Sequence, residues 1–232
     1  MQEILNEEKK ENINEEKQEF VPKKGFKFKC YLFFKRIFDI FSSGMVLLLF
    51  SPLYLLIALL VKCGDGGKVF YKHKRMGKDG KYIYIPKFRS MKKNADRLED
   101  MLTPEQLAQY KKEYKIDNDP RITKVGGFLR KTSLDELPNL WSVFKGDISV
   151  VGPRPIMEEE VKEKYGDDAK KLLSVKPGLT GWWAANGRNN KTYDSGERQK
   201  MELYYVDNCS AMLDLKIIFK TVGRVFKRDG AK

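Results

Sequence analysis

The sequence has few of the residues that build disulfide scaffolds or zinc sites. Its three cysteines, Cys30, Cys63 and Cys209, show no C-x-x-C spacing, and the single histidine, His73, cannot complete a zinc site with them. A glycine-rich nucleotide loop of either common type and an internal repeat are also missing. These absences argue against a disulfide-stabilised module, a structural zinc module and a repeat array.

Charge is distributed unevenly along the 232 residues, whose formal net charge is +13. Residues 1–20 contain seven glutamates and three lysines with almost no apolar periodicity, so we predict a disordered acidic tail over residues 1–24. Residues 21–232 contain 42 basic and 25 acidic residues, a net charge of +17. Such a surface favours a polyanionic partner, either nucleic acid, anionic lipid or a phosphorylated substrate.

A long hydrophobic run extends from Ile37 to Val61, where Asp39 is the only charged residue and 19 of 25 positions are apolar. A signal peptide would begin near residue 1 and end at a small-residue cleavage site, so we predict a membrane segment instead, over residues 25–62. One straight helix over the run would be about 37 Å long, enough to cross a hydrocarbon core of about 30 Å. Length alone is therefore compatible with a spanning helix.

Ser51 and Pro52 interrupt this run. Proline removes a backbone donor and collides with the preceding turn, so a kink or reversal is expected there. The two arms would be about 22 and 14 Å long, and neither would cross a bilayer. Basic residues flank the run on both sides, and positive flanks tend to stay cytoplasmic. These features favour a re-entrant membrane helix hairpin, with a spanning helix and a buried helix of a soluble domain as alternatives.

Residues 63–232 are predicted to form a small cytoplasmic domain that is mostly α with little β. Short strands are expected over 69–71 and 82–85, around a turn at 77–80. Helices are expected over 91–115, with a break at Thr103-Pro104, and over 156–173.

The basic C-terminus is predicted to form an amphipathic helix over Leu213–Arg228. Apolar residues recur there at helical spacing, among several lysines and arginines. The pattern is typical of an interfacial helix lying on anionic lipid, although an ordinary helix packed on the domain explains it nearly as well.

Two adjacent carboxylates, Asp135 and Glu136, lie in the most informative stretch of the chain. One interpretation is structural, with Ser133 and Glu136 forming a helix-capping box. In the functional interpretation one carboxylate is a nucleophile and the other a Mg²⁺ ligand. Arg130 and Arg154 would then neutralise phosphate, and the prolines on both sides of Arg154 would keep its loop stiff.

Six motifs occur together in one order, and as a set they resemble those of the bacterial sugar transferases of the monotopic phosphoglycosyl transferase family. The resemblance covers roughly residues 33–228. The motifs are Lys35-Arg36-Ile37-Phe38-Asp39, Ser51-Pro52, Pro86-Lys87-Phe88-Arg89-Ser90-Met91, Leu134-Asp135-Glu136-Leu137-Pro138, Val151-Gly152-Pro153-Arg154-Pro155 and Lys176-Pro177-Gly178-Leu179-Thr180-Gly181.

The resemblance implies an enzyme that transfers a hexose 1-phosphate, of galactose or glucose, from a UDP-sugar to undecaprenyl phosphate and releases UMP. This reaction begins the assembly of capsule, exopolysaccharide or another glycan, and N-acetylated sugars stay open as substrates. Asp135 would carry the phosphosugar covalently, Glu136 would bind Mg²⁺, and Ser51 and Pro52 would form the re-entrant turn. The implied substrate-binding cations are Lys87, Arg89, Arg130 and Arg154.

The resemblance also implies a place at the inner membrane, with the catalytic domain on its cytoplasmic face and in contact with anionic lipid. A homodimer is plausible, and nucleic acid is the least expected partner. Two other functions remain open, a basic membrane-anchored binding module without catalysis and a glycosyltransferase that releases UDP. We interpret His73 as structural, residues 94–118 as a surface insertion, and Trp182 and Trp183 as either substrate contacts or core residues.

Overall fold

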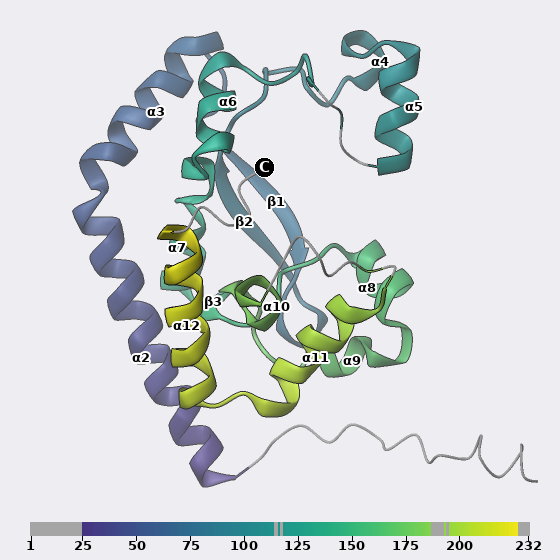
Figure 1. Ribbon diagram of the computed structural model, residues 1–232. Coiled ribbons are helices and arrows are strands. Elements are labelled where there is room, and N and C mark those ends of the chain that lie inside the picture. The colour runs from purple at the N-terminus through teal and green to yellow at the C-terminus, as the bar shows by residue number, and fades with distance from the viewer. Residues whose placement is uncertain (1–24, 114–115, 117, 187–192, 194, 227–232) are drawn as a thin grey trace, which may run out of the picture.

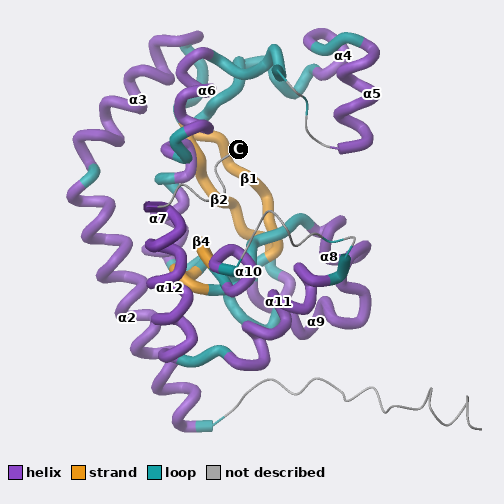
Figure 2. The backbone as a smooth tube through the Cα atoms, viewed as in Figure 1, coloured by secondary structure: helices purple, strands orange, loops and turns teal. Residues whose placement is uncertain are grey.

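The computed structural model describes residues 25–113, 116, 118–186, 193 and 195–226, so the predicted tail lies outside the described residues. A long bent helical arm runs along one side of a body made of helices and two small sheets (Figure 1). The strands lie at the centre of this body with helices around them (Figure 2). The predicted class, mostly α with little β, is confirmed.

The arm consists of α2 (Phe26–Leu49) and α3 (Ser51–Asp65), which meet at a bend of 63°. Pro52 lies in the first turn of α3, and the Ser51 hydroxyl donates to the Leu48 carbonyl over 2.8 Å. The predicted break at Ser51-Pro52 is thus confirmed. Because the bend is 63°, the arms diverge and do not lie antiparallel against each other. Among the described residues no single helix is long and apolar enough to cross a membrane, whereas the bent pair together meets that test.

Buried charged residues fix α2 to the body. Asp39 is 3% exposed and accepts hydrogen bonds from the Ser149 hydroxyl at 3.1 Å and the Val150 backbone N–H at 2.9 Å. Lys35 forms a 2.6 Å ion pair with Asp214 of α12. The charged residue in the hydrophobic run is therefore a docking group that faces the protein, as expected for a buried charge, which needs partners.

The two predicted strands are present as β1 (Phe70–Met76) and β2 (Tyr82–Phe88). They pair antiparallel around the 3-10 turn η1 (Lys78–Gly80). Lys87 lies opposite Tyr71 in this ribbon, two positions from His73. Alternate residues of a strand and directly paired residues share one face, so Lys87, His73 and Arg75 project from the same side of the ribbon.

A small lobe follows the ribbon, built from α4 (Leu98–Met101) and α5 (Pro104–Glu113) (Figure 1). The predicted break is confirmed, because the Thr103 hydroxyl accepts from the Gln106 N–H and the Gln106 side chain accepts from the Thr103 N–H. The chain then enters α6 (Lys124–Lys131), the turn η2 (Leu134–Glu136) and α7 (Asn139–Lys145).

The last third contains a second, parallel sheet of β3 (Ser149–Val151) and β4 (Gly178–Thr180). The single helix predicted over 156–173 is wrong. Gly166 has a φ of 47° and ends α8 (Glu158–Tyr165), after which η3 (Gly166–Asp168) and α9 (Ala169–Leu172) follow. The chain continues with α10 (Trp182–Ala185), α11 (Glu197–Asn208) and α12 (Ala211–Phe226).

The C-terminal helix α12 confirms the amphipathic prediction within the described residues, and it divides its apolar side chains between two faces. Leu213 and Ile217 are buried against the core that contains Val151 and Tyr205. Other large apolar side chains of the same helix, Met212, Leu215, Phe219 and Val222, are exposed. The helix therefore packs on the domain and still presents an apolar face to its surroundings.

Candidate active site

Asp135 and Glu136 lie on an isolated 3-10 turn between two helices. Ser133, directly before this turn, has a left-handed φ of 57° and its side chain makes no capping hydrogen bond. The capping-box interpretation is therefore wrong. A short turn between α6 and Pro138 leaves Glu136 exposed and Asp135 partly buried, so both carboxylates remain accessible at the surface of the fold.

Two cations from different elements lie around this turn. Lys87, near the end of β2, reaches Glu136 with an Nζ to Oε1 distance of 2.6 Å. Arg130, in the last turn of α6, is oriented by a 2.8 Å hydrogen bond from its Nε to the Ser90 hydroxyl. The fold thus brings together four of the residues that the sequence predicted for the site.

The charges at this turn act on Asp135 in opposing directions. Burial raises the pKa of the Asp135 carboxyl above its usual value, and the adjacent Glu136 carboxylate raises it further, whereas Lys87 and Arg130 lower it. A partly desolvated carboxylate keeps more of its nucleophilicity than one fully solvated by water, provided that it stays ionised. Lys87 and Arg130 therefore favour the ionised form of Asp135, which this residue needs to act as a nucleophile near neutral pH.

Arg154 is held in place by the residues around its backbone. Its N–H donates to the Glu202 carboxylate at 3.2 Å, and its guanidinium lies 6.0 Å from the centre of the Trp183 ring. Glu202 is buried, and burial raises its pKa to about 7 despite the nearby Arg198. This buried carboxyl positions the loop that carries Arg154.

Glycines allow the two motifs around Arg154 to form one unit. A Cβ on Gly178 would lie 2.1 Å from the Gly152 nitrogen, and a Cβ on Gly181 would lie 2.3 Å from the Gly152 carbonyl oxygen. The backbones are joined by hydrogen bonds from Gly178 N–H to Pro153 O at 2.8 Å and from Gly152 N–H to Thr180 O at 2.9 Å. The contact between β3 and β4 therefore fixes where the Arg154 loop begins.

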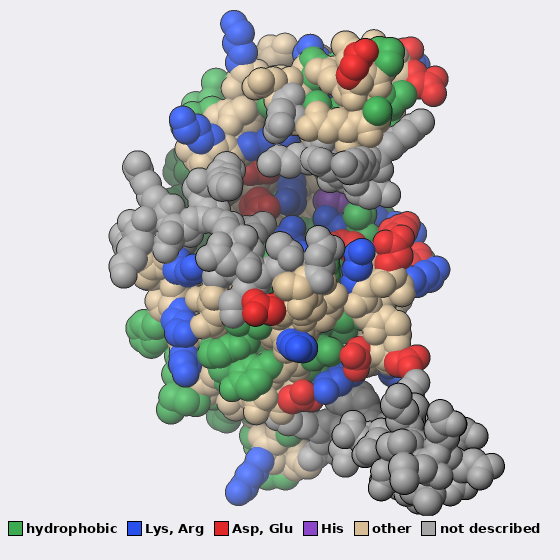
Figure 3. All heavy atoms as spheres, turned by 45° about the vertical axis from the view of Figure 1, so that its right-hand side comes forward, with side chains coloured by type: hydrophobic (Ala, Val, Ile, Leu, Met, Phe, Trp, Pro, Cys, Tyr) green, Lys and Arg blue, Asp and Glu red, His purple; other side chains and the backbone are tan. Residues whose placement is uncertain are grey.

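His73 lies on the same face of the ribbon as Lys87 and Arg75. Its Nδ1 lies 3.3 Å from Arg75 Nη2. Burial lowers the His73 pKa to about 4, and Arg75, Lys87 and Arg154 lower it further by charge repulsion. Lys and Arg side chains lie beside the histidine in a hollow of the surface (Figure 3). The period-2 alternation of the first strand was the signal that could have placed Arg75 and His73 on the face of Lys87.

Arg198 is a second residue that the sequence did not reveal. Its guanidinium lies 4.3 Å from the centre of the Trp183 ring and 3.8 Å from that of Tyr193. The buried Nε and Nη2 atoms have no hydrogen-bond partner among the residues that the structure describes. Trp183 is therefore buried between cations, whereas Trp182 packs beside Tyr204, and the neighbouring residues 187–189 lie outside the described residues.

Arg89 is engaged elsewhere in the fold. Its guanidinium forms a two-point ion pair with Asp65 at the end of α3, and its Nε donates to the Lys68 carbonyl at 2.5 Å. A further hydrogen bond reaches the Met91 carbonyl. In this structure Arg89 ties the arm to the ribbon, and its donors are engaged by Asp65, Lys68 and Met91.

Comparison with known proteins now assigns the chain. The model of the bacterial sugar transferase family matches residues 30–228. The chain belongs to this family.

Similar bacterial sugar transferases have been named for their substrates or pathways. An undecaprenyl-phosphate galactose phosphotransferase of Salmonella typhimurium is 46% identical over 202 residues, which are 86% of this chain and 42% of that protein. The exopolysaccharide production protein ExoY of Rhizobium meliloti is 46% identical over 194 residues, 82% of this chain and 84% of ExoY. A UDP-glucose:undecaprenyl-phosphate glucose-1-phosphate transferase of Escherichia coli is 40% identical over 202 residues, 85% of this chain and 41% of that enzyme. The chain thus spans less than half the length of the Salmonella and Escherichia proteins and most of the length of ExoY.

Proposed function

We propose that this sugar transferase moves a hexose 1-phosphate, of galactose or glucose, from a UDP-sugar to undecaprenyl phosphate and releases UMP. The observation that carries this proposal is the partly buried Asp135 between two cations, Lys87 and Arg130, on a turn that leaves it accessible. Similarity to proteins named for these donors and this acceptor supports the choice of substrates. The glycan assembled afterwards would be an exopolysaccharide or capsule, in line with the name of ExoY.

In this proposal the transfer takes place in two displacements. An Asp135 carboxylate oxygen bonds to the phosphorus next to the sugar, and the bond from that phosphorus to the bridging oxygen of UMP breaks. An oxygen of undecaprenyl phosphate then bonds to the same phosphorus, and the bond to Asp135 breaks. The products are UMP and a diphosphate-linked sugar, and the Asp135 carboxylate is regenerated.

Cations are required because an anionic nucleophile approaches an anionic phosphate. Lys87 and Arg130 lie beside Asp135, and Arg154 adds positive charge near His73. Preorganised positive groups stabilise the charge that spreads over the transferring phosphoryl oxygens. Together they account for the basic residues that cluster in this hollow.

Glu136 is the residue that we propose as the Mg²⁺ ligand. Within the described residues no group of three or more His, Cys, Asp and Glu side chains could hold a metal ion. Mg²⁺ is often bound by one or two carboxylates together with substrate phosphates, so the exposed Glu136 carboxylate beside a diphosphate fits this ion. When bound, the ion would supply positive charge to the transferring phosphoryl group.

The released nucleotide tests the reaction. Membranes containing the protein would be incubated with Mg²⁺, undecaprenyl phosphate and either UDP-galactose or UDP-glucose. We expect UMP together with a lipid-linked sugar diphosphate. Release of UDP would instead indicate a glycosyltransferase, and release of neither nucleotide would favour a binding module.

We also propose that the bent arm enters the inner membrane from the cytoplasmic face and returns to it. The exposed apolar side chains of α2 and α3, such as Phe41, Leu48 and Leu56, support contact with lipid, and those of α12 extend this surface. A membrane-impermeant maleimide should label the exposed Cys63 and a cysteine introduced at Lys27 from the same face, in a variant without Cys30. Labelling from opposite faces would indicate a spanning helix.

The pH dependence of UMP release should report on Asp135, which must be ionised to attack. Because burial raises its pKa, the rate should fall at acid pH as this carboxyl becomes protonated. Lys87 lowers that pKa, so Lys87→Met should move the acid limb of the pH–rate profile to higher pH as well as reduce the maximal rate. An acid limb that stays in place would argue against Lys87 acting on Asp135. Lys92→Met, at an exposed lysine outside the site, is the matched control.

A further inference from the structure

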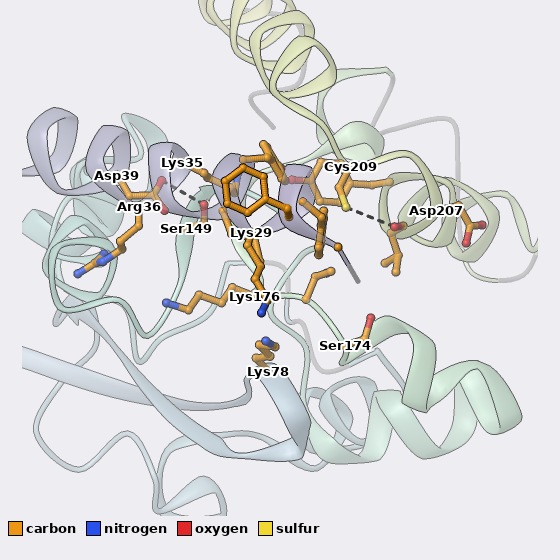
Figure 4. Close-up of a pocket in the computed structure, with 18 residues that line it drawn as sticks. Lys29, Lys35, Arg36, Asp39, Lys78, Ser149, Ser174, Lys176, Asp207 and Cys209 are labelled. Carbon is orange, nitrogen blue, oxygen red and sulfur yellow. Dashed lines mark hydrogen bonds between the residues drawn. The ribbon is translucent and has the colours of Figure 1, made fainter. Parts of the chain in front are cut away.

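A cavity of about 870 Å³ lies apart from the candidate active site. It is bounded by the first half of α2, the turn η1, the segment before β4 and the end of α11 (Figure 4). None of the five residues proposed for catalysis and phosphate binding lines it, namely Lys87, Arg130, Asp135, Glu136 and Arg154. The cavity is therefore a separate feature of the fold.

The two acidic residues that line the cavity already have partners. Asp39 accepts hydrogen bonds from Ser149 and Val150, and Asp207 forms a 2.8 Å ion pair with Lys171. Among the described residues neither carboxylate forms an ion pair with a cation that lines the cavity.

Three of the five lining cations are exposed lysines without a direct partner among the described residues. Lys35 is paired with Asp214, and Arg36 donates to two backbone carbonyls at the end of α7. The side chains of Lys29, Lys78 and Lys176 make no hydrogen bond or ion pair with any residue that the structure describes. They come from α2, η1 and the segment before β4, and each lines the same cavity (Figure 4).

Gathering like charges in one space is unfavourable unless an anion joins them. Burial lowers the pKa of Lys176, and repulsion from Arg36 and Lys78 lowers it further, whereas Asp39 and Asp147 raise it. An anion seated among the three lysines would offset this repulsion. The cavity has the charge of an anion-binding site, and its lysines are point charges of the kind that bind phosphate.

The other part of the cavity wall is apolar and continues onto the arm. Phe26, Phe28 and Leu32 line the cavity from α2, and Phe26 and Leu32 are also exposed. The next exposed side chains of α2, Phe33 and Phe34, belong to the apolar surface that we assign to the membrane. A ligand in this cavity would therefore meet positive charge at one end and hydrocarbon at the other.

We propose that this cavity binds the phosphodiester headgroup of an anionic membrane phospholipid, with its acyl chains along the apolar face of α2. The shared chemistry is a phosphate group, and the apolar wall favours a lipid over free phosphate. The proposal rests on the membrane placement of the arm proposed above. The site would hold the first half of α2 at the headgroup level, beside the domain to which Asp39 and Lys35 dock it.

Binding can be measured with the full-length protein in detergent and phosphatidylglycerol that carries a fluorescent acyl chain. Each lysine near an anionic lipid contributes roughly fivefold in affinity, so the triple variant Lys29→Gln, Lys78→Gln, Lys176→Gln should bind about a hundredfold more weakly. The matched control is Lys27→Gln, Lys81→Gln, Lys170→Gln, which removes the same charge from equally exposed lysines that do not line the cavity. The control should bind as the wild type does.

Competition identifies the ligand. Unlabelled phosphatidylglycerol should displace the probe, whereas phosphatidylcholine and inorganic phosphate at equal concentration should not. Three results would overturn the proposal. Equal loss of binding in both triple variants would show that only general surface charge matters. Displacement by inorganic phosphate would indicate a free-anion site, and preferential displacement by undecaprenyl phosphate would indicate an acceptor site. UMP release by the same preparations is recorded separately. A protein that binds lipid without releasing UMP would contradict the proposed reaction but not the lipid site.

Discussion

Asp135→Asn should lower the rate of UMP release by about 10⁴-fold or more, since loss of a covalent nucleophile removes the first displacement altogether. Asparagine keeps the size and hydrogen-bonding capacity of the side chain on η2 but not its negative charge. With UDP-sugar and no acceptor, the wild type should release up to one UMP per protein and retain a phosphosugar detectable by mass spectrometry of the intact chain. The variant should show neither.

Asp79→Asn provides the matched control. Asp79 is exposed in the turn η1 at a φ of 56°, a conformation that asparagine tolerates well, and it lies outside the candidate site. This variant should release UMP at the wild-type rate. An Asp135→Asn protein that still formed the phosphosugar adduct would eliminate Asp135 as the nucleophile and turn attention to Glu136.

Gly178→Ala should both destabilise the fold and impair catalysis. The new Cβ would lie 2.1 Å from the Gly152 nitrogen, a backbone atom that cannot move aside without separating β3 from β4. Overpacking of this kind typically costs up to about 3 kcal/mol in the free energy of unfolding. Because the Arg154 loop starts at this junction, a shift of about 1 Å could lower the rate about 10²-fold. Thermal unfolding and UMP release measure the two effects.

The control for this substitution is Gly223→Ala in α12. A Cβ at Gly223 would meet no atom within 4 Å, and alanine favours a helix over glycine by about 1 kcal/mol. We therefore expect unchanged or slightly raised stability and normal UMP release. Unfolding temperatures that fall equally in both variants would show that the approach of Gly178 to Gly152 is not what makes glycine necessary.

The hydrophobic arm illustrates what local sequence can predict. Ser51 and Pro52 break the helix for reasons confined to a few residues, namely a missing donor, a steric collision and a hydroxyl that bonds the preceding turn. The strands around η1 and the break at Thr103-Pro104 were predicted for the same kind of reason. The angle of the bend was not predicted, because it also depends on how each arm packs against the body.

Asp39 shows where local reasoning stopped. In the sequence it is a charge inside an apolar run, and in the fold it is a buried acceptor for the start of the second sheet, more than a hundred residues away. A contact of that separation leaves no periodic signal near either partner. The cavity beside it has the same origin, since Lys29, Lys78 and Lys176 gather there from three distant segments.

Some features of the candidate site were likewise predictable from the sequence and others were not. The sequence by itself determined the family resemblance, the adjacent carboxylates and two cations that lie around them, Lys87 and Arg130. It also suggested Arg89 as a substrate contact, whereas the structure shows this guanidinium bound to Asp65. Which arginine is used for structure and which faces the carboxylates depends on partners that meet through folding.

Tertiary structure alone placed Arg198 against Trp183 and made Gly152 and Gly178 a single junction. Residue type and spacing specify which side chains can do chemistry, because these properties are local. Their burial, their charge neighbours and therefore their pKa values depend on the segments packed against them, as the opposing effects on Asp135 show. The reactive residue types could be predicted from the sequence, whereas the charges and burial around them depend on the fold.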